Sequence, residues 1–230
     1  MTKKIFVEGI GTFFLMLTIG QVALNPGASP FGPLAIGSVL MCMVYAGGHV
    51  SGAHYNPAVT LAVFVRRRAT VHDLIGYIVF QIVAAALAAS LVLWLKGAGP
   101  LTLPDFDTPT VFVAELVFTF ALAFVVLNVA TARGVEGNSY FGLAIGFTVM
   151  AGAFAVGPIS GAHFNPAVTI GHLVLGNIGV GDLWLYLLPE LLGGAGAALV
   201  FNVLDLGEDK LTTANPAEQA GLAPPAEPEA

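Results

Sequence analysis

The chain alternates long apolar stretches with short polar connections. Each long stretch has about the 20 residues that a helix needs to cross a bilayer, and none shows the alternation of a transmembrane β-strand. We expect six spanning helices, at about 5–24, 33–50, 73–95, 110–130, 140–157 and 182–204. The first stretch resembles a signal peptide. Because Glu8 interrupts it and 110–130 echoes it, we interpret it as a retained helix.

Two shorter apolar stretches, at about 56–65 and 165–175, are too short to span a bilayer. Each begins with Asn-Pro and follows Ser-Gly-Ala-His. Asn is a favourable helix N-cap and Pro suits the first helical turn, so the pattern predicts two half-helices. The glycine-rich segments before them, 47–52 and 157–161, are expected to be extended, with carbonyl groups along a path.

An internal repeat organises the whole chain. SGAHYNPAVT at 51–60 recurs as SGAHFNPAVT at 160–169, with nine of ten residues identical at an offset of 109. LAIG at 34–37 recurs at 143–146 with the same offset. The chain is therefore a duplicated unit of three helices and one half-helix. Because three is odd, the second copy inserts upside down, and we expect an all-α integral membrane protein built as an inverted repeat.

The repeats predict one channel-like domain over 1–204, with repeat one at about 1–104 and repeat two at about 105–204. The remaining segment, 205–230, is rich in Pro, Ala and Glu, and we expect a disordered cytoplasmic tail. It contains a third Asn-Pro-Ala, at 215–217, to which we assign no function because neither Ser-Gly-Ala-His nor an apolar helix accompanies it.

Composition excludes several other classes of protein. Of the 230 residues, 57% are hydrophobic and only 10% are charged, against about 25% charged in an ordinary soluble domain. A net charge of −6 without a basic stripe excludes nucleic-acid binding. The single cysteine, Cys42, excludes an internal disulfide. We expect no metal and no cofactor.

Basic residues predict the orientation in the membrane. With a cytoplasmic N-terminus, only Lys96 lies outside, and both termini lie inside. The short loops and the absence of Asn-x-Ser/Thr acceptors favour the cell (inner) membrane. The basic residues on the cytoplasmic side are Lys3, Lys4, Arg66, Arg67, Arg68, Arg133 and Lys210.

Half-helices that enter from opposite faces meet N-terminus to N-terminus near the bilayer centre. Each N-terminus carries about half a positive charge and unpaired N–H groups, so cations and protons are disfavoured there. Asn56 and Asn165 stand at these tips, where their amide groups can donate hydrogen bonds to a passing solute oxygen. The box residues behind them set the first turn and allow close packing: Pro57, Ala58, Pro166 and Ala167.

Paired Asn-Pro-Ala boxes after Ser-Gly-Ala-His resemble the aquaporin and aquaglyceroporin (major intrinsic protein) family over about residues 4–204. The resemblance implies a passive channel, with lipid and small uncharged solutes as partners, and a homotetramer. It also implies that Asn56 and Asn165 are the central donors. It assigns the narrow outer constriction to four positions counted from the boxes, which here are Ile36, Ala153, Ala162 and Val168.

The second box departs from the family because NPAVT stands where members usually have NPAR. Small or medium apolar groups replace an aromatic ring, an imidazole and a guanidinium, so the constriction is expected to be wider, less polar and less positive. We therefore expect a channel for water and small uncharged solutes such as glycerol, and solutes larger than water, such as urea, also become plausible. A channel for polyols or neutral metalloid acids with little water selectivity is one alternative, and a coupled secondary transporter is another.

Carboxylates within apolar segments need hydrogen-bond partners. The resemblance implies that Glu8 and Glu115 brace the loops before the half-helices, and Gln81 with its repeat counterpart Glu190 is expected to help. His54 and His163 each precede a box Asn by two residues and are interpreted as loop-packing residues, while His172 has no motif around it. No arrangement of catalytic residues is visible, so we expect no enzyme.

Overall fold

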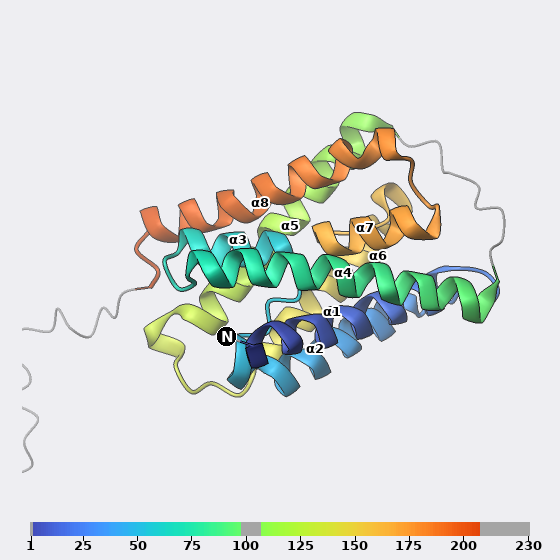
Figure 1. Cartoon of the computed structure of the whole chain (residues 1–230). Helices are drawn as coiled ribbons and strands as arrows, with labels where there is room; N and C mark the ends of the chain where they lie inside the picture. Colours follow the sequence, from blue (N-terminus) through green and yellow to red (C-terminus); the bar gives the residue numbers. More distant parts are fainter. Residues whose placement is uncertain (1, 98–106, 208–230) are drawn as a thin grey trace, which may run out of the picture.

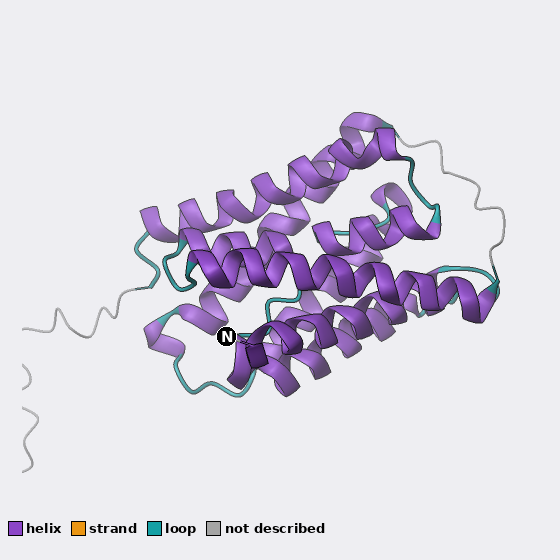
Figure 2. Cartoon of the chain, in the orientation of Figure 1, coloured by secondary structure: helices purple, strands orange, loops and turns teal. Residues whose placement is uncertain are grey.

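The computed structural model describes residues 2–97 and 107–207, a part of the chain that is helical and contains no strand (Figure 2). Short 3₁₀ turns occur at Arg133–Val135 and Val180–Asp182, and two short helices are α3 (Pro57–Val65) and α7 (Pro166–Leu175). The six-span, two-half-helix fold is confirmed. The helices long and apolar enough to span a membrane are α1 (Thr2–Ala23), α2 (Gly32–Ser51), α4 (Val71–Lys96), α5 (Thr108–Thr131), α6 (Phe141–Ser160) and α8 (Leu183–Val203).

One sequence expectation about local structure is wrong. Residues 47–51 and 157–160 are not extended but form the last turns of α2 and α6. The helices end one residue later, where Gly52 and Gly161 adopt left-handed φ values of 90° and 87°. The predicted boundary between the repeats, at 104–105, and most of the predicted tail, at 208–230, lie outside the described residues.

The packing of the helices follows the sequence repeat. In each repeat the first and third spanning helices pack together, as α1 on α4 and as α5 on α8, while α2 of one repeat packs on α6 of the other. The half-helices α3 and α7 lie between the long helices, begin near the middle of the molecule and run toward opposite ends (Figure 1). The N-terminal ends of α3 and α7 therefore both lie near the centre of the molecule.

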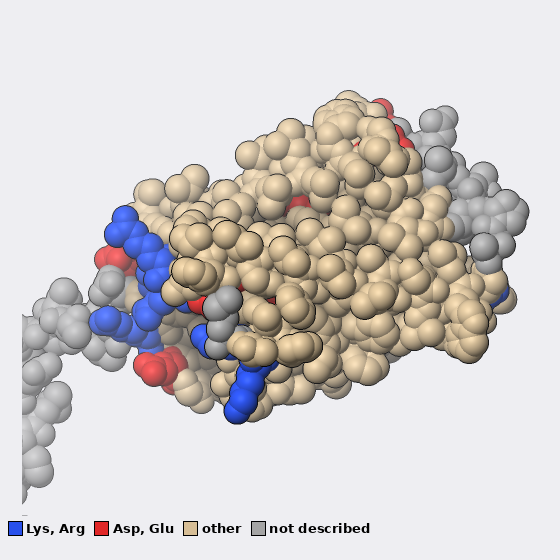
Figure 3. Space-filling model, viewed as in Figure 1, with Lys and Arg blue, Asp and Glu red and all other residues tan. Residues whose placement is uncertain are grey.

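The outer surface is suited to lipid. On α1, Phe6, Ile10 and Phe14 are 56%, 55% and 45% exposed, and their spacing of four places them on one helix face. Lys and Arg side chains gather at the end of the molecule where α1 begins and α3 ends, while the flank between the two ends is almost free of charge (Figure 3). On the face shown, this distribution sets an apolar band apart from a basic end.

The crossing of α2 and α6 depends on two glycines of the repeated LAIG segment. A Cβ atom at Gly37 would lie 2.6 Å from the carbonyl oxygen of Gly146, and one at Gly146 would lie 2.5 Å from the carbonyl oxygen of Gly37. Backbone atoms cannot move aside as a flexible side chain can. The two repeats therefore approach each other here as closely as their backbones allow.

We expect Gly37→Ala to destabilise the protein by about 1–3 kcal/mol, because the added methyl group forces α2 and α6 apart. Thermal unfolding of the detergent-solubilised protein measures this effect. Gly157→Ala is the matched control, since it lies in α6 and a Cβ atom there meets nothing within 4 Å. Equal melting temperatures for the two variants would contradict the close crossing.

Candidate functional site: the paired half-helix tips

Each half-helix begins at the Asn of its box. Asn56 caps α3 by accepting hydrogen bonds at Oδ1 from the backbone N–H groups of Ala58 (2.8 Å) and Val59 (3.4 Å). Asn165 caps α7 in the same way, with Oδ1 accepting from Ala167 N–H at 3.0 Å. The prolines that follow occupy the first helical turn, where no N–H group is needed. The side-chain oxygens are thus used within the helices, and the amide nitrogens are left for other partners.

The amide nitrogens join the two tips reciprocally. Asn56 Nδ2 donates to the carbonyl oxygen of Phe164 at 2.8 Å, and Asn165 Nδ2 donates to that of Tyr55 at 2.9 Å. Tyr55 and Phe164 both have left-handed backbones, with φ of 51° and 53°. Because an amide nitrogen carries two hydrogens, each Asn keeps one for another acceptor. The tips therefore form one cross-bonded unit.

The loop before α3 is held by Glu8, which is fully buried. Its carboxylate accepts from the backbone N–H groups of His54 (2.9 Å) and Tyr55 (2.6 Å), from Ser51 Oγ (2.6 Å) and from Gln81 Nε2 (2.9 Å). Every one of these donors belongs to the first repeat. The buried charge is thus surrounded by donors that fix the strained loop.

Glu115 occupies the equivalent place in the second repeat. It accepts from the backbone N–H groups of His163 (3.0 Å) and Phe164 (2.7 Å) and from Ser160 Oγ (2.6 Å). Glu190 accepts from Asn165 N–H (3.1 Å) and Thr169 Oγ1 (2.7 Å). Its other oxygen, Oε2, is buried and has no partner among the described residues. The second repeat thus has a carboxyl group where the first has the amide of Gln81.

We expect Glu190→Gln to raise the free energy of unfolding by about 1–3 kcal/mol, because it removes a buried oxygen that has no donor. The amide would place its nitrogen toward Glu115, as Gln81 does toward Glu8. Gln81→Glu is the mirror-image control and should lower the melting temperature, since it sets a second carboxylate against Glu8. A lower melting temperature for Glu190→Gln would show that the carboxyl group of Glu190 has a buried partner.

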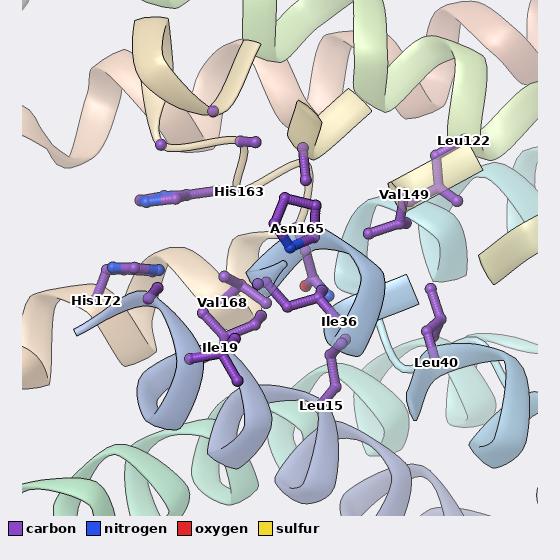
Figure 4. Close-up of a pocket in the computed structure, with 18 of the residues that line it drawn as sticks. Leu15, Ile19, Ile36, Leu40, Leu122, Val149, His163, Asn165, Val168 and His172 are labelled. Carbon is purple, nitrogen blue, oxygen red and sulfur yellow. The ribbon is translucent and has the colours of Figure 1, made fainter. Parts of the chain in front are cut away.

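The tips border a cavity of about 550 Å³. Its lining includes both Asn side chains and all four residues assigned to the constriction, Ile36, Ala153, Ala162 and Val168. Figure 4 shows Asn165, Ile36 and Val168 between a pair of histidines and an apolar group of Leu40, Leu122 and Val149. The Asn amides thus face a cavity whose wall is otherwise mostly aliphatic.

A second cavity, of about 590 Å³, lies toward the basic end of the molecule, and its lining includes Arg68 and Arg133. His54 and Val126 line both cavities, so the two meet at these side chains. The first cavity contains the paired tips, and the second extends from His54 toward the basic end of the molecule. The other predicted site residues are buried and line neither cavity: Pro57, Ala58, Pro166, Ala167, Glu8, Gln81, Glu115 and Glu190.

Sequence reasoning missed two features of the site. Tyr77 and Tyr186 donate to the carbonyl oxygens of Ser51 (2.7 Å) and Ser160 (3.0 Å), closing the ends of α2 and α6. The two tyrosines are 109 residues apart, which is the offset of the internal repeat, so the repeat could have identified them as a pair. His172 stacks on His163 in the cavity wall, and no repeat signal could have found it. Among the described residues, no group of three or more potential ligands could hold a metal.

Six apolar helices around two opposed and cross-bonded half-helices define a class, that of integral membrane proteins with a cavity between inverted repeats. The sequence model of the major intrinsic protein family matches residues 1–158 and 112–224. The chain therefore belongs to the major intrinsic protein family.

Comparisons with individual proteins are consistent with membership of this family. The chain is 39% identical over 218 residues to Aquaporin NIP1-4 of Oryza sativa subsp. japonica, covering 90% of this chain and 79% of that protein. It is 34% identical over 214 residues to Nodulin-26 of Glycine max, covering 88% and 78% respectively. The aquaglyceroporin structure from Plasmodium falciparum shares the fold, with a TM-score of 0.73, 20% identity, and coverage of 89% of this chain and 99% of that chain.

Proposed function

We propose that the chain is a passive transmembrane channel for water and small uncharged solutes. The observation that carries this proposal is the reciprocal pair of hydrogen bonds from Asn56 and Asn165, which fixes two helix N-termini face to face beside the cavity that both side chains line. Their positive ends disfavour cations and protons, while the remaining amide hydrogens donate to solute oxygens. Family membership, an aquaporin relative and an aquaglyceroporin of the same fold support the same function.

The solute range follows from the four constriction positions, which we propose form the selectivity filter. Ile36, Ala153, Ala162 and Val168 bring no charge and no fixed side-chain donor to the cavity. We therefore propose that glycerol or a similar small polyol passes together with water. Neutral metalloid acids, which are also uncharged and hydroxylated, are the alternative solute class.

A coupled transporter is disfavoured by a specific contact. Alternating access requires one repeat to move against the other. Here each tip donates a buried hydrogen bond to the opposite repeat, so such motion would break both bonds. A fixed path with opposed tips fits passive flow better.

The orientation and assembly belong to the same proposal. The side chains of Lys3, Lys4, Arg66–Arg68 and Arg133 favour a cytoplasmic basic end with both termini inside. The short loops favour the cell (inner) membrane. Membership of the family supports a homotetramer with one pore in each subunit. We propose that residues 1–204 make the channel domain and that 205–230 form a cytoplasmic tail.

The test is solute flux in proteoliposomes. Vesicles with the protein should shrink faster than empty vesicles under a sorbitol gradient, and they should reswell faster in glycerol. The flux should not saturate and should not depend on an ion gradient, because no step of a carrier cycle limits it. Equal rates with folded protein present and with empty vesicles would contradict the proposal, and saturating, ion-dependent flux would support a transporter.

A further inference from the structure

Three aromatic rings stack in the second repeat only, and two of them, His163 and His172, line the cavity. The ring centroid of His163 lies 4.1 Å from that of His172, with 13° between the planes, and 4.3 Å from that of Tyr186. In the first repeat His54 meets Tyr77 edge-on instead, and Val63 stands at the position equivalent to His172. The stack therefore breaks the symmetry of the pore.

Hydrogen bonds fix which nitrogen of His163 carries the hydrogen. Its Nδ1 lies 2.9 Å from Thr169 Oγ1, and the Thr169 hydroxyl donates its single hydrogen to Glu190 Oε1. The hydroxyl oxygen must then accept from Nδ1–H, which leaves a lone pair on Nε2 of the neutral ring. A Cβ atom at Gly161 would lie 3.2 Å from this Nε2, so the glycine leaves the acceptor uncovered.

The opposite arrangement holds for His172. Its Nδ1 lies 2.8 Å from Asn177 Nδ2. An amide nitrogen can only donate, so Nδ1 accepts and Nε2 carries the hydrogen of the neutral ring. Among the described residues, neither Nε2 atom has a hydrogen-bond partner, although both rings line the cavity (Figure 4). The pair thus presents one acceptor and one donor on two stacked rings.

We propose that His163 and His172 form a recognition site for vicinal hydroxyl groups, an inference that rests on the polyol permeability proposed above. One hydroxyl of a 1,2-diol donates to His163 Nε2, while its neighbour accepts from His172 Nε2–H. A single water molecule can bridge the same two atoms, so the site does not obstruct water.

The position of the pair strengthens this assignment. His172 lies four residues after Val168 on α7, so both side chains are on one face of the helix. His163 directly follows Ala162. Val168 has no hydrogen-bond donor, and His172 supplies one a helical turn farther along the same wall of the cavity. The constriction gains polar specificity without gaining a charge.

The experiment compares two isomers of equal size, propane-1,2-diol and propane-1,3-diol, in proteoliposomes. Rates in empty vesicles are subtracted, and water flux in the same vesicles shows that the pore is open. The wild-type chain should favour the 1,2-isomer by about three- to tenfold, the effect of one hydrogen bond. His172→Phe keeps a stacked ring but removes the donor, so the preference should disappear.

Asn177→Asp provides the second variant in case His172→Phe does not fold. A carboxylate only accepts, so Nδ1 of His172 must take the hydrogen and Nε2 becomes an acceptor while every ring stays in place. The preference should again disappear. His72→Phe makes the same substitution at an exposed position of α4 outside both cavities and should keep it.

The outcomes separate this inference from the proposed function. Equal flux of the two isomers in the wild type overturns the histidine site but leaves the channel proposal intact. A preference for the 1,2-isomer that survives in both variants has the same consequence. Water flux with no flux of either diol refutes polyol permeability, and the histidine site with it. A 1,2-preference that is lost in His172→Phe or Asn177→Asp and kept in His72→Phe supports the site.

Discussion

Val168→Arg combined with Ala153→His is expected to lower the ratio of glycerol to water permeability about tenfold or more, which corresponds to ~1.4 kcal/mol in the barrier. Val168 and Ala153 line the same cavity, so the new side chains narrow one passage from two sides. The guanidinium also adds five donors and a fixed positive charge. Water is small enough to reorient around these donors and should keep much of its flux, whereas glycerol should not.

The measurement is osmotic shrinkage and glycerol reswelling of the same proteoliposomes. Val168→Met is the matched control for volume, because it adds a long side chain without donors or charge. It should reduce the permeability ratio less than Val168→Arg does alone. A wild-type ratio already near zero would refute the wide filter, and selectivity would then reside in other residues.

The spanning helices could be predicted because the bilayer requires a minimum length of apolar sequence. The half-helices could also be predicted, since Asn56-Pro57 and Asn165-Pro166 combine an N-cap with a residue suited to the first turn. Buried Glu8 and Glu115 were visible as charges in apolar segments that had to find donors. These inferences need only local sequence and the physics of the membrane.

Other features depend on tertiary approach. The glycine at position 47 suggested an extended backbone, but Gly47 lies within α2. Its lack of a side chain makes room for Tyr55, because a Cβ atom at Gly47 would clash with the Tyr55 hydroxyl. The carbonyl acceptors of the Asn amides belong to the opposite repeat. His172 replaces the Val63 of the first repeat, so the repeat pattern suggested nothing about it. Such contacts join segments that are far apart in the sequence, and the pattern of apolar and polar residues within each segment does not predict them.

The cross-bonded tips lead to the second large effect. Asn165→Asp should keep the helix cap, because a carboxylate oxygen still accepts from Ala167 N–H. It loses the donor to Tyr55 and places a negative charge between two positive helix ends. Unpairing one buried carbonyl costs about 1–3 kcal/mol, so the tips should separate and glycerol flux should fall about tenfold. The charge should also admit cations.

Asn56→Asp should have the same effect, because it loses the equivalent bond to Phe164. Asn128→Asp is the matched control, since its amide donates within α5 and it lines neither cavity. Glycerol reswelling and the decay of a potassium gradient are measured for all three variants. The opposed helix ends exclude cations only while the residues between them are neutral, so both tip variants should leak potassium and the control should not. If glycerol flux and the potassium gradient are unchanged in both tip variants, the Asn side chains do not border the conducting path.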